Sequence, residues 1–440
     1  MAKLAAKASV ASSQPEVDLL LCCTRTCVDA ESAERIRTLL REDIDWVYLS
    51  GIALLHGTTP LLYRSLHTTC PEAVPKAILD PLQDHFHTNA SRNVFLAGEL
   101  LKLLSLLEAH RIPAIPYKGP VLAASAYGDL TLRQFYDLDI LVHKRDILTA
   151  KELFIAQGYW PSLQMTSAQE AAYLQSHHDY KLVRGDDAVV VELQWGVTQA
   201  FFSFPLDFDH LWERREQVTL AGTTVLNLAP EDLLLVLCVH GSKHLWRRLG
   251  WICDVAELIR ARPRMNWRRV LEQAHALGGK RMLLLGLALA NDLLGAVLPE
   301  AILQSIRADH SVTALAAWVK GRLFPPVGDP SGLLEERPAL DLQDESPVLY
   351  FRMRERWRDQ VAVCVHYGPD YLHRVITPNQ RDWALLSLPS WLSGLYYLLR
   401  PLRLIGAYGR DVGTTLSSMW IDRGSPLKEY PSPTTPGEGA

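Results

Sequence analysis

The feature that most constrains this chain is a short acidic stretch that runs directly into an apolar segment, YDLDILV at residues 136–142. An apolar run rich in branched side chains is typical of a buried strand, in which residues i and i+2 point to the same face. Asp137 and Asp139 are therefore expected side by side. Adjacent carboxylates repel each other unless a cation lies between them, and hard oxygen ligands favour Mg²⁺ or Mn²⁺. A strand end in contact with solvent is the simpler alternative.

A second predicted strand carries a further acid. Residues 180–184 and 188–195 flank a short polar turn, which predicts a β-hairpin. Alternation along the second strand places Glu192 and Gln194 on one face. Charged side chains are rarely buried in an apolar strand unless they are paired or bound to metal, so Glu192 is a candidate third carboxylate. An edge strand with one wet face is the alternative.

A turn with a glycine precedes the acidic stretch. Residues 111–117 are expected to be extended, because residues that precede proline are pushed out of the helical region. Residues 120–127 are expected to form a short helix with a proline in its first turn. Gly119 thus lies at a strand-to-helix turn, where free backbone N–H groups can face a phosphate.

A cationic stripe is predicted on a helix that runs from Pro230 to Arg248, and Asp254 follows on the next helix. The stripe consists of His240, Lys243, His244 and Arg247, which are spaced i, i+3, i+4 and i+7. It is either a solvated face or a face turned toward a triphosphate. A zinc site is a weaker alternative, because the histidine pair lacks the intervening glutamate of catalytic zinc helices.

The overall composition excludes a strong general attraction to nucleic acid or to an anionic membrane. The 440 residues include 45 basic and 49 acidic side chains, so a nucleic-acid partner needs a local patch. This length suggests about two or three domains. The seven cysteines show no paired CxxC spacing, and the first fifteen residues lack the apolar core of a secretory signal. We therefore expect reduced cysteines and a cytoplasmic protein.

An uncharged segment near the C-terminus leaves open a contact with a membrane. Residues 383–399 are uncharged, but a membrane span needs about 20 apolar residues, and Pro389 and Gly394 interrupt this run. Two buried helices are the favoured interpretation. A peripheral membrane contact through residues 383–403, or a transmembrane helix, stays open as an alternative.

Several motifs occur in a fixed order along about 150 residues. They are Lys118-Gly119, Tyr127, Arg133, Asp137-x-Asp139, Val191-Glu192-x-x-Trp195, His240-x-x-Lys243-His244 and Trp251-x-x-Asp254. This series resembles a poorly characterised bacterial nucleotidyltransferase family of the DNA polymerase beta superfamily. It is more distantly similar to nucleotidyltransferase toxins of abortive-infection systems. Two positions depart from the superfamily: its usual Gly-Ser or Gly-Gly is Lys118-Gly119 here, and Gln194 stands where histidine is common.

The resemblance implies an α+β fold, with a mixed-sheet core of the polymerase-beta-like nucleotidyltransferase type between N- and C-terminal helical regions. It divides the chain into an N-terminal helical region (1–95), a nucleotidyltransferase α/β core (96–228), a helical domain that completes the active site (229–325), a C-terminal helical region (326–423) and a tail (424–440). The composition of the tail predicts disorder.

The resemblance also implies an activity, the transfer of a nucleoside monophosphate from a nucleoside triphosphate (NTP) to a hydroxyl by a two-metal mechanism. The implied metal ligands for Mg²⁺ or Mn²⁺ are Asp137, Asp139 and Glu192, and Lys243 completes the catalytic set. The implied nucleotide-binding residues are Lys118, Gly119, Arg133, Lys243 and Asp254. Glu192 is either a base or only a ligand, and Arg133 either faces the nucleotide or braces the two aspartates.

The acceptor is left open among tRNA, a sugar, a small molecule and a protein. An RNA acceptor would need a basic groove, for which the sequence offers Arg247, Arg248, Arg260, Arg262 and Arg264 with Trp246 and Trp267. The sequence fixes neither the base of the NTP nor the oligomeric state. The alternative function is a catalytically degenerate nucleotide-binding scaffold in a polysaccharide- or peptide-modification pathway, although a pure binder has no need of three converging carboxylates.

Overall fold

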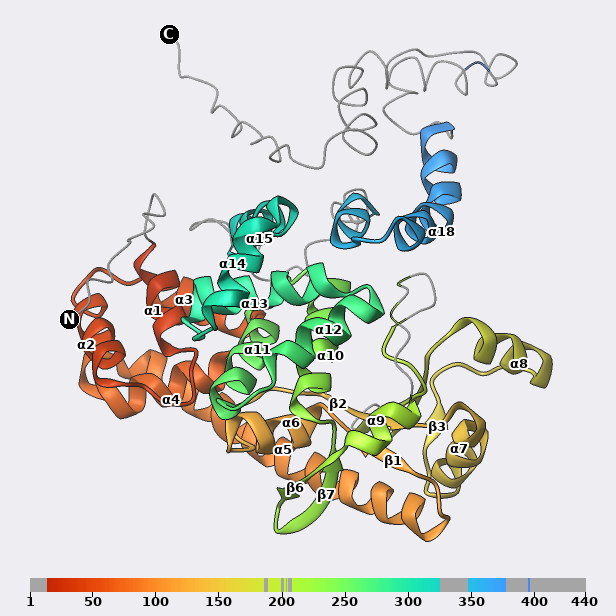
Figure 1. The fold of residues 1–440 in the computed structure, drawn as a ribbon. Coiled ribbons are helices and arrows are strands. Elements are labelled where there is room, and N and C mark those ends of the chain that lie inside the picture. The colour runs from red at the N-terminus through yellow and green to blue at the C-terminus, as the bar shows by residue number, and fades with distance from the viewer. Residues whose placement is uncertain are drawn as a thin grey trace.

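The computed structural model describes residues 14–185, 189–198, 202, 204, 208–324, 347–376 and 395. An N-terminal group of helices comes first in the chain (Figure 1). It comprises α1 (Pro15–Cys23), α2 (Ala30–Leu39), α3 (Trp46–Leu55), α4 (Thr59–Thr69), the 3₁₀ turn η1 (Pro71–Ala73) and α5 (Lys76–Ala109). Aspartates cap the N-termini of α2 and α3. The side chains of Asp29 and Asp45 accept hydrogen bonds from the backbone N–H groups three residues later.

A five-stranded mixed sheet forms the core, in the order β1-β2-β5-β4-β3. Its strands are β1 (Ala114–Pro116), β2 (Asp137–Val142), β3 (Trp160–Pro161), β4 (Asp179–Arg184) and β5 (Val189–Gln194). β2 and β5 are parallel, whereas the other neighbours are antiparallel. The predicted hairpin is the β4–β5 pair. The edge-strand interpretation of Glu192 is wrong, because β5 is hydrogen-bonded on both sides.

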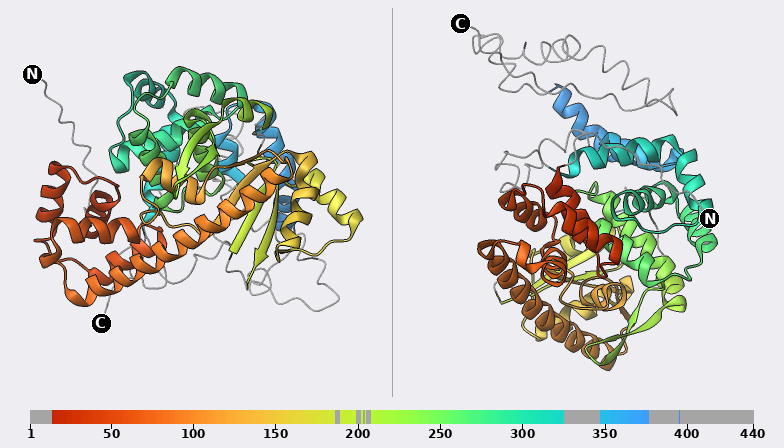
Figure 2. Two further views of the ribbon diagram at one scale, coloured as in Figure 1. Left: turned by 90° about the horizontal axis from the view of Figure 1, so that it is seen from below. Right: turned by 90° about the vertical axis from the view of Figure 1, so that its left-hand side faces the viewer.

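One face of the sheet is covered by helices. Leu138 and Ile140 of β2 are fully buried in one core cluster with leucines of α5, such as Leu100 and Leu103. Phe154 of α7 (Ile147–Ala156) belongs to the same cluster. The alternation of side chains then turns Asp137 and Asp139 toward the opposite face. Figure 2 shows α5 as the long helix that runs from the N-terminal helices to the sheet.

Short elements connect the strands and lead out of the sheet. They are α6 (Gly119–Leu122), the π-helical turn η2 (Ala123–Tyr127), η3 (Lys144–Asp146), α8 (Ser167–Ser176), α9 (Phe208–Arg214) and a separate hairpin of β6 (Glu216–Leu220) and β7 (Thr223–Asn227). The predicted short helix after Gly119 is therefore α6 with η2. The mixed sheet and its flanking helices confirm the predicted α+β fold class.

A helical region packs over the rest of the core. It comprises α10 (Pro230–Lys243), α11 (Leu249–Ala261), α12 (Trp267–Leu277), α13 (Lys280–Leu294), α14 (Glu300–Ala308), α15 (His310–Leu323) and α18 (Trp357–Ile376). α13 packs against its neighbours α10, α11 and α15. Trp246 is fully buried between glycines, since a Cβ at Gly241 or Gly286 would lie 2.5 Å or 2.9 Å from its ring. The absence of these two side chains makes the space for the indole.

The helix that was predicted to reach Arg248 ends at Lys243. Leu245 and Trp246 adopt left-handed backbone angles, with φ of 54° and 52°, and such angles end a right-handed helix. Arg247 therefore lies beyond the helix and is exposed, so it does not continue the cationic stripe of α10.

Two sequence predictions lie largely outside the described residues. The uncharged segment 383–399 is described only at Leu395, and the tail 424–440 is not described. Among the described helices, none has both the length and the apolar character needed to cross a membrane. The domain boundaries stay predictions. The helix α5 alone extends over residues on both sides of the predicted limit at 95.

The close packing of Trp246 generates a stability prediction. Gly241→Ala places a methyl group 2.5 Å from the buried indole, so we expect overpacking to lower the free energy of unfolding by about 1–3 kcal/mol. Gly98→Ala is the matched control, because Gly98 lies inside α5 with no atom within 4 Å of its would-be Cβ. This control is expected to raise the free energy of unfolding by about 0.5–1 kcal/mol. Urea denaturation measures both, and equal effects of the two substitutions would contradict the packing described above.

Candidate active site

Three acidic side chains lie together on the face of the sheet opposite α5. Asp137 and Asp139 are two residues apart on β2, and Asp139 lies directly opposite Glu192 in the parallel pairing of β2 with β5. Paired residues of neighbouring strands project to the same face. Asp139 is only 3 % exposed, so the solvent-exposed strand end is the wrong interpretation for this residue. The structure thus brings together the three predicted metal ligands.

Lys118 and Gly119 adjoin these carboxylates from the turn between β1 and α6. The Lys118 ammonium lies 3.1 Å from Asp139 Oδ1, and the lysine side chain is largely buried. Gly119 has φ of 51°, and a Cβ there would lie 3.0 Å from the carbonyl oxygen of Asp137. Only glycine satisfies both the left-handed angle and this close approach without strain. Gly119 therefore lets the turn lie directly against the acidic strand.

Gln194 connects the acids of the two strands, a role that the sequence analysis missed. Its amide nitrogen donates hydrogen bonds to Asp139 Oδ1 at 2.6 Å and to Glu192 Oε2 at 3.0 Å. Its amide oxygen accepts a hydrogen bond from the Tyr117 hydroxyl. Gln194 and Tyr117 are both almost completely buried. The signal in the sequence is that Gln194 lies two residues from Glu192, on the same face of β5.

Burial and the proximity of the acids shift the pKa values of Asp137, Glu192 and Lys118. Burial, and then the charges of Asp139 and Asp137, raise the pKa of Glu192 to about 7. Burial, and then Asp139, raise the pKa of Asp137 above its ordinary value. Burial alone would lower the pKa of Lys118, but the negative charge of Asp139 and its neighbours outweighs it and raises that pKa. Lys118 thus pairs with one of the three carboxylates, Asp139, and the other two keep raised pKa values.

The three carboxylates are ligands of the type that a divalent hard cation prefers. The three side chains offer carboxylate oxygens, and burial raises the pKa of two of them, Asp137 and Glu192, so a cation there would offset the cost of their charge. Within the described residues, no group of three or more His, Cys, Asp or Glu side chains is arranged as a metal cage. The ammonium of Lys118 instead lies against Asp139.

The helical region adds positive charge from α10. Burial lowers the pKa of Lys243, and Lys118 lowers it further, whereas Asp179, Glu192 and Asp139 oppose this shift. These interactions place the Lys243 ammonium within the field of the acidic face. It forms no hydrogen bond or ion pair with any part of the chain that the structure describes. Lys243 is therefore available to an anionic ligand.

Two histidines accompany Lys243: His240 within α10 and His244 directly after it. The ring centroids of His240 and His244 are 4.7 Å apart, and the ring of Trp251 packs at 5.5 Å from the first and 5.1 Å from the second. Burial and the nearby lysines lower the pKa of His240 well below its usual range and that of His244 to about 3. Both imidazoles are therefore neutral near pH 7.

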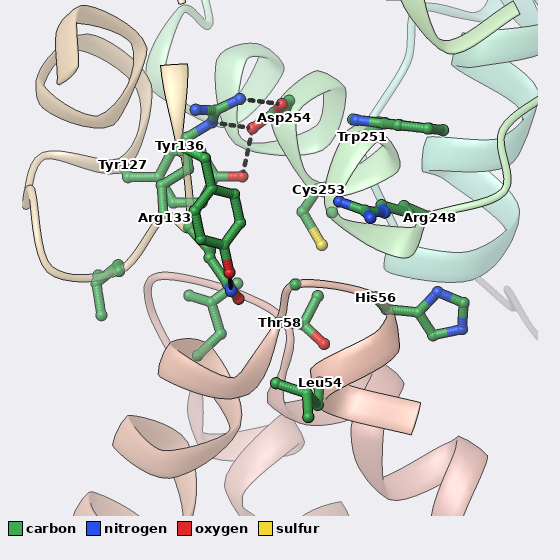
Figure 3. Close-up of a pocket in the computed structure, with 15 residues that line it drawn as sticks. Leu54, His56, Thr58, Tyr127, Arg133, Tyr136, Arg248, Trp251, Cys253 and Asp254 are labelled. Carbon is green, nitrogen blue, oxygen red and sulfur yellow. Dashed lines mark hydrogen bonds and ion pairs between the residues drawn. The ribbon is translucent and has the colours of Figure 1, made fainter. Parts of the chain in front are cut away.

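Arg133 and Asp254, both predicted to bind nucleotide, bind each other. Arg133 donates from Nε and Nη2 to the two carboxylate oxygens of Asp254, at 2.7 Å and 2.9 Å, and the Tyr127 hydroxyl donates to Asp254 Oδ1 at 2.7 Å (Figure 3). The charge of Arg133 partly offsets the rise in the pKa of Asp137 that burial and Asp139 cause. Its side chain thus braces the acidic face electrostatically and ties the core to α11.

Two asparagines of α5, which the sequence analysis missed, hold the backbone of the loop before β2. Asn93 donates to the carbonyl oxygens of Leu130 at 2.5 Å and Arg133 at 2.8 Å. Asn89 donates to the carbonyl oxygen of Thr131 at 2.9 Å. Both asparagines are buried, and they fix the loop that carries Arg133 toward Asp137.

The predicted basic groove is only partly present. Arg247, Arg248 and Arg264 are exposed. Arg260 forms an ion pair with Glu257, and Arg262 forms one with Glu216 at 2.6 Å. The inclusion of Trp246 is wrong, because its ring is fully buried and has no surface for a base to stack on.

The buried ion pair predicts a large loss of stability when it is broken. Arg133→Ala leaves Asp254, which is 3 % exposed, as an uncompensated buried charge. We expect the free energy of unfolding to fall by about 3–5 kcal/mol. Arg37→Ala, which removes an exposed pair with Glu34, should change it by less than about 1 kcal/mol. Equal losses in urea denaturation would contradict the role of the Arg133–Asp254 pair.

The raised pKa of Glu192 predicts a pH dependence of stability. The folded protein holds this proton up to about pH 7, whereas the ordinary value is 4.5, so the folded state binds more protons between these limits. The stabilisation of wild type relative to Glu192→Gln should therefore fall as the pH rises from about 4.5 to 7. Urea denaturation in a metal chelator at several pH values measures this difference. Parallel profiles for the two proteins would show that Glu192 titrates normally.

Comparison with known proteins identifies the family of this chain. The model of a family described as uncharacterised nucleotidyltransferase matches residues 42–295, which include the acidic strands, Lys118 and the helices α10 and α11. A crystal structure described as an antigenic nucleotidyltransferase-like protein from Paracoccidioides brasiliensis matches 48 % of this chain and 96 % of its own, with 16 % identity and a TM-score of 0.27. No curated protein gives a significant match. Because the family model spans more than half of its 440 residues, the chain belongs to the uncharacterised nucleotidyltransferase family.

Proposed function

We propose that the protein transfers a nucleoside monophosphate from an NTP to an acceptor hydroxyl and releases pyrophosphate. The observation that carries the proposal is the meeting of Asp137, Asp139 and Glu192 on one face of the sheet, in a member of a nucleotidyltransferase family. Nucleotidyl transfer needs the charge of a triphosphate to be neutralised and an acceptor oxygen to be held in line. The acidic face and the lysines beside it match these two needs.

Asp137, Asp139 and Glu192 would hold Mg²⁺ or Mn²⁺. Ions bound there would supply Lewis-acid stabilisation of the charge that develops on the phosphate oxygens. The excess of negative charge at these residues supports this part of the proposal, since Lys118 is the one cation paired with them in the described chain. The position of Gln194 supports it too, because one amide holds carboxylates of both strands in place.

The lysines would bind the triphosphate. Lys243 faces the acidic residues from α10 and has no partner among the described residues, so its ammonium can bind phosphate oxygens. Lys118 would exchange its contact with Asp139 for a phosphate, from its position beside Gly119. The neutral His240 near the end of α10 and His244 directly after it would donate hydrogen bonds to the same anion.

Glu192 would accept the proton of the acceptor hydroxyl. Its carboxylate lies opposite Asp139 at the edge of the acidic cluster, and a carboxylate there can take a proton from a hydroxyl that approaches over β5. Glu192 lies on β5, so the acceptor would approach over β5 rather than over the turn with Gly119. The acceptor itself stays open among RNA, a sugar, a small molecule and a protein. A bacterial and cytoplasmic setting belongs to the proposal as an expectation from the sequence.

A nucleotide-binding scaffold without turnover is the second candidate. The observation that favours it is the ion pair of Lys118 with Asp139, which places an ammonium where the proposed enzyme needs a metal ion. Such a protein would bind NTP through Lys243 and leave it intact. It would serve as an interaction partner in a polysaccharide- or peptide-modification pathway.

Asp139→Asn tests the proposed reaction. The variant keeps the shape of the side chain but removes the charge at the centre of the acidic face, so we expect transfer to fall by at least about a hundredfold. The measurement uses NTPs labelled at the α-phosphate, Mg²⁺ and total cell extract, with transferred label and released pyrophosphate as readouts. Asp292→Asn, at an exposed acid of α13, is the matched control and should keep full activity.

The outcomes separate the two candidates. Loss of transfer in Asp139→Asn with an unchanged unfolding midpoint supports the enzyme. Transfer that survives in this variant would move the reaction away from the acidic face. A nucleotide-dependent rise of Tm in wild type, without label transfer or pyrophosphate release, would favour the scaffold.

A further inference from the structure

A pocket of about 290 Å³ lies beside the acidic face, between the N-terminal helices and α11. It is formed by three chain segments: the turn between α3 and α4, the loop that precedes β2, and the start of α11 (Figure 3). Gly250 of α11 donates a backbone hydrogen bond to the carbonyl oxygen of His56 at 3.1 Å, which fastens the first segment to the third. The pocket walls are therefore bonded to each other.

The pocket is on the Asp137 side of the acidic face. Tyr136 and Arg133 both line it. Tyr136 directly precedes Asp137, and the charge of Arg133 acts on the Asp137 carboxylate. None of its lining residues comes from β5, the strand of Glu192. Trp251 lines the pocket and packs against His240 and His244. A ligand in the pocket thus adjoins the proposed phosphate-binding side chains and leaves Glu192 free for the acceptor.

The buried wall of the pocket is electrically neutral, but it offers unused hydrogen-bonding groups. The charges of Arg133 and Asp254 cancel in their bidentate pair. Arg133 Nη1 and Gln134 Oε1 are both buried and have no hydrogen-bond partner among the described residues. Buried polar atoms without partners are costly, so one donor and one acceptor here call for a ligand or water. Arg248, which also lines the pocket, is exposed.

Aromatic rings form two further parts of the wall. Tyr136 is 47 % exposed, and its hydroxyl accepts a hydrogen bond from the Gln134 amide nitrogen, which directs the amide oxygen away from that hydroxyl. In Figure 3, Tyr136 and Trp251 lie on opposite sides of the pocket, with Cys253 between them. The Arg92 guanidinium lies over one face of the Tyr136 ring, 4.9 Å from its centre, so the other face of Tyr136 and the partly exposed Trp251 are the flat surfaces against which a planar ring can pack.

We propose that this pocket binds the base of the nucleotide substrate. A purine or pyrimidine is planar, uncharged and carries a donor and an acceptor at its edge, which matches the rings, the neutral wall and the free Arg133 and Gln134 atoms. The inference rests on the proposed function for the identity of the ligand. It goes beyond that function by assigning the base to this pocket, which lies between the α3–α4 turn and α11. It also assigns the acceptor to the part of the acidic face where Glu192 lies.

Nucleosides without phosphates test this assignment on the full chain. Adenosine, guanosine, cytidine and uridine are each measured by saturation-transfer NMR in the absence of Mg²⁺. Inorganic tripolyphosphate is the probe of the phosphate site, and its binding is measured by ³¹P line broadening. We expect at least one nucleoside to bind and to be displaced by its own triphosphate. Tyr136→Leu should weaken that binding by about tenfold, the effect expected from loss of a stacking ring. Tripolyphosphate binding should be unchanged.

Gln134→Leu provides the readout of specificity. Removal of the buried amide oxygen should change the ratio of affinities among the four NTPs by about tenfold. A general loss of folding would instead lower all four affinities together. Trp357→Leu is the matched control, because Trp357 is 68 % exposed on α18 and does not line the pocket. It should leave nucleoside binding unchanged.

The possible results separate this assignment from the proposed reaction. If no nucleoside binds and Tyr136→Leu leaves the affinities for all four NTPs unchanged, the pocket does not hold the base, even where label transfer is observed. If nucleosides bind as described but no label is transferred, the assignment stands and the proposed reaction fails. If Gln134→Leu leaves the ratio of NTP affinities unchanged, the amide does not contact the base.

Discussion

Repulsion between three carboxylates on one face of a sheet is the interaction around which the centre of this structure is arranged. Asp139 and Glu192 lie opposite each other on neighbouring parallel strands, and both are removed from bulk water, where their repulsion would be weak. The surrounding side chains reduce this cost. Lys118 supplies charge, and Gln194 supplies one N–H to each of the two strands. Tyr117 then orients the amide of Gln194.

The helical region is positioned by a second buried electrostatic contact. Arg133 belongs to the loop before β2, and Asp254 belongs to α11, so their bidentate pair joins the sheet to the helices. α10 precedes α11 and packs directly against it. The pair therefore also determines where Lys243, at the end of α10, stands relative to the acids. The asparagines of α5 add rigidity on the other side of the same loop.

Local patterns in the sequence predicted the face of the acidic strand, the β4–β5 hairpin and the position of Glu192. These features depend on side-chain alternation within a few residues. The pairing of β2 with β5 and the pairing of Arg133 with Asp254 join distant parts of the chain, and no local pattern contains them. The end of α10 was misplaced for a related reason. Burial of Trp246 against Gly241 and Gly286 outweighs the helical preference of the residues around it.

The length of α5 gives the molecule a mechanical axis. Its 34 residues correspond to a length of about 50 Å. This single helix packs against α4 of the N-terminal group and against β1 and α7 of the core. α5 joins the N-terminal helices and the sheet into one frame, and Pro81 breaks its hydrogen-bond pattern only near its start. The α3–α4 turn is part of this frame and supplies one wall of the pocket. The α3–α4 side of the pocket and the sheet that carries the acids are therefore attached to the same helix.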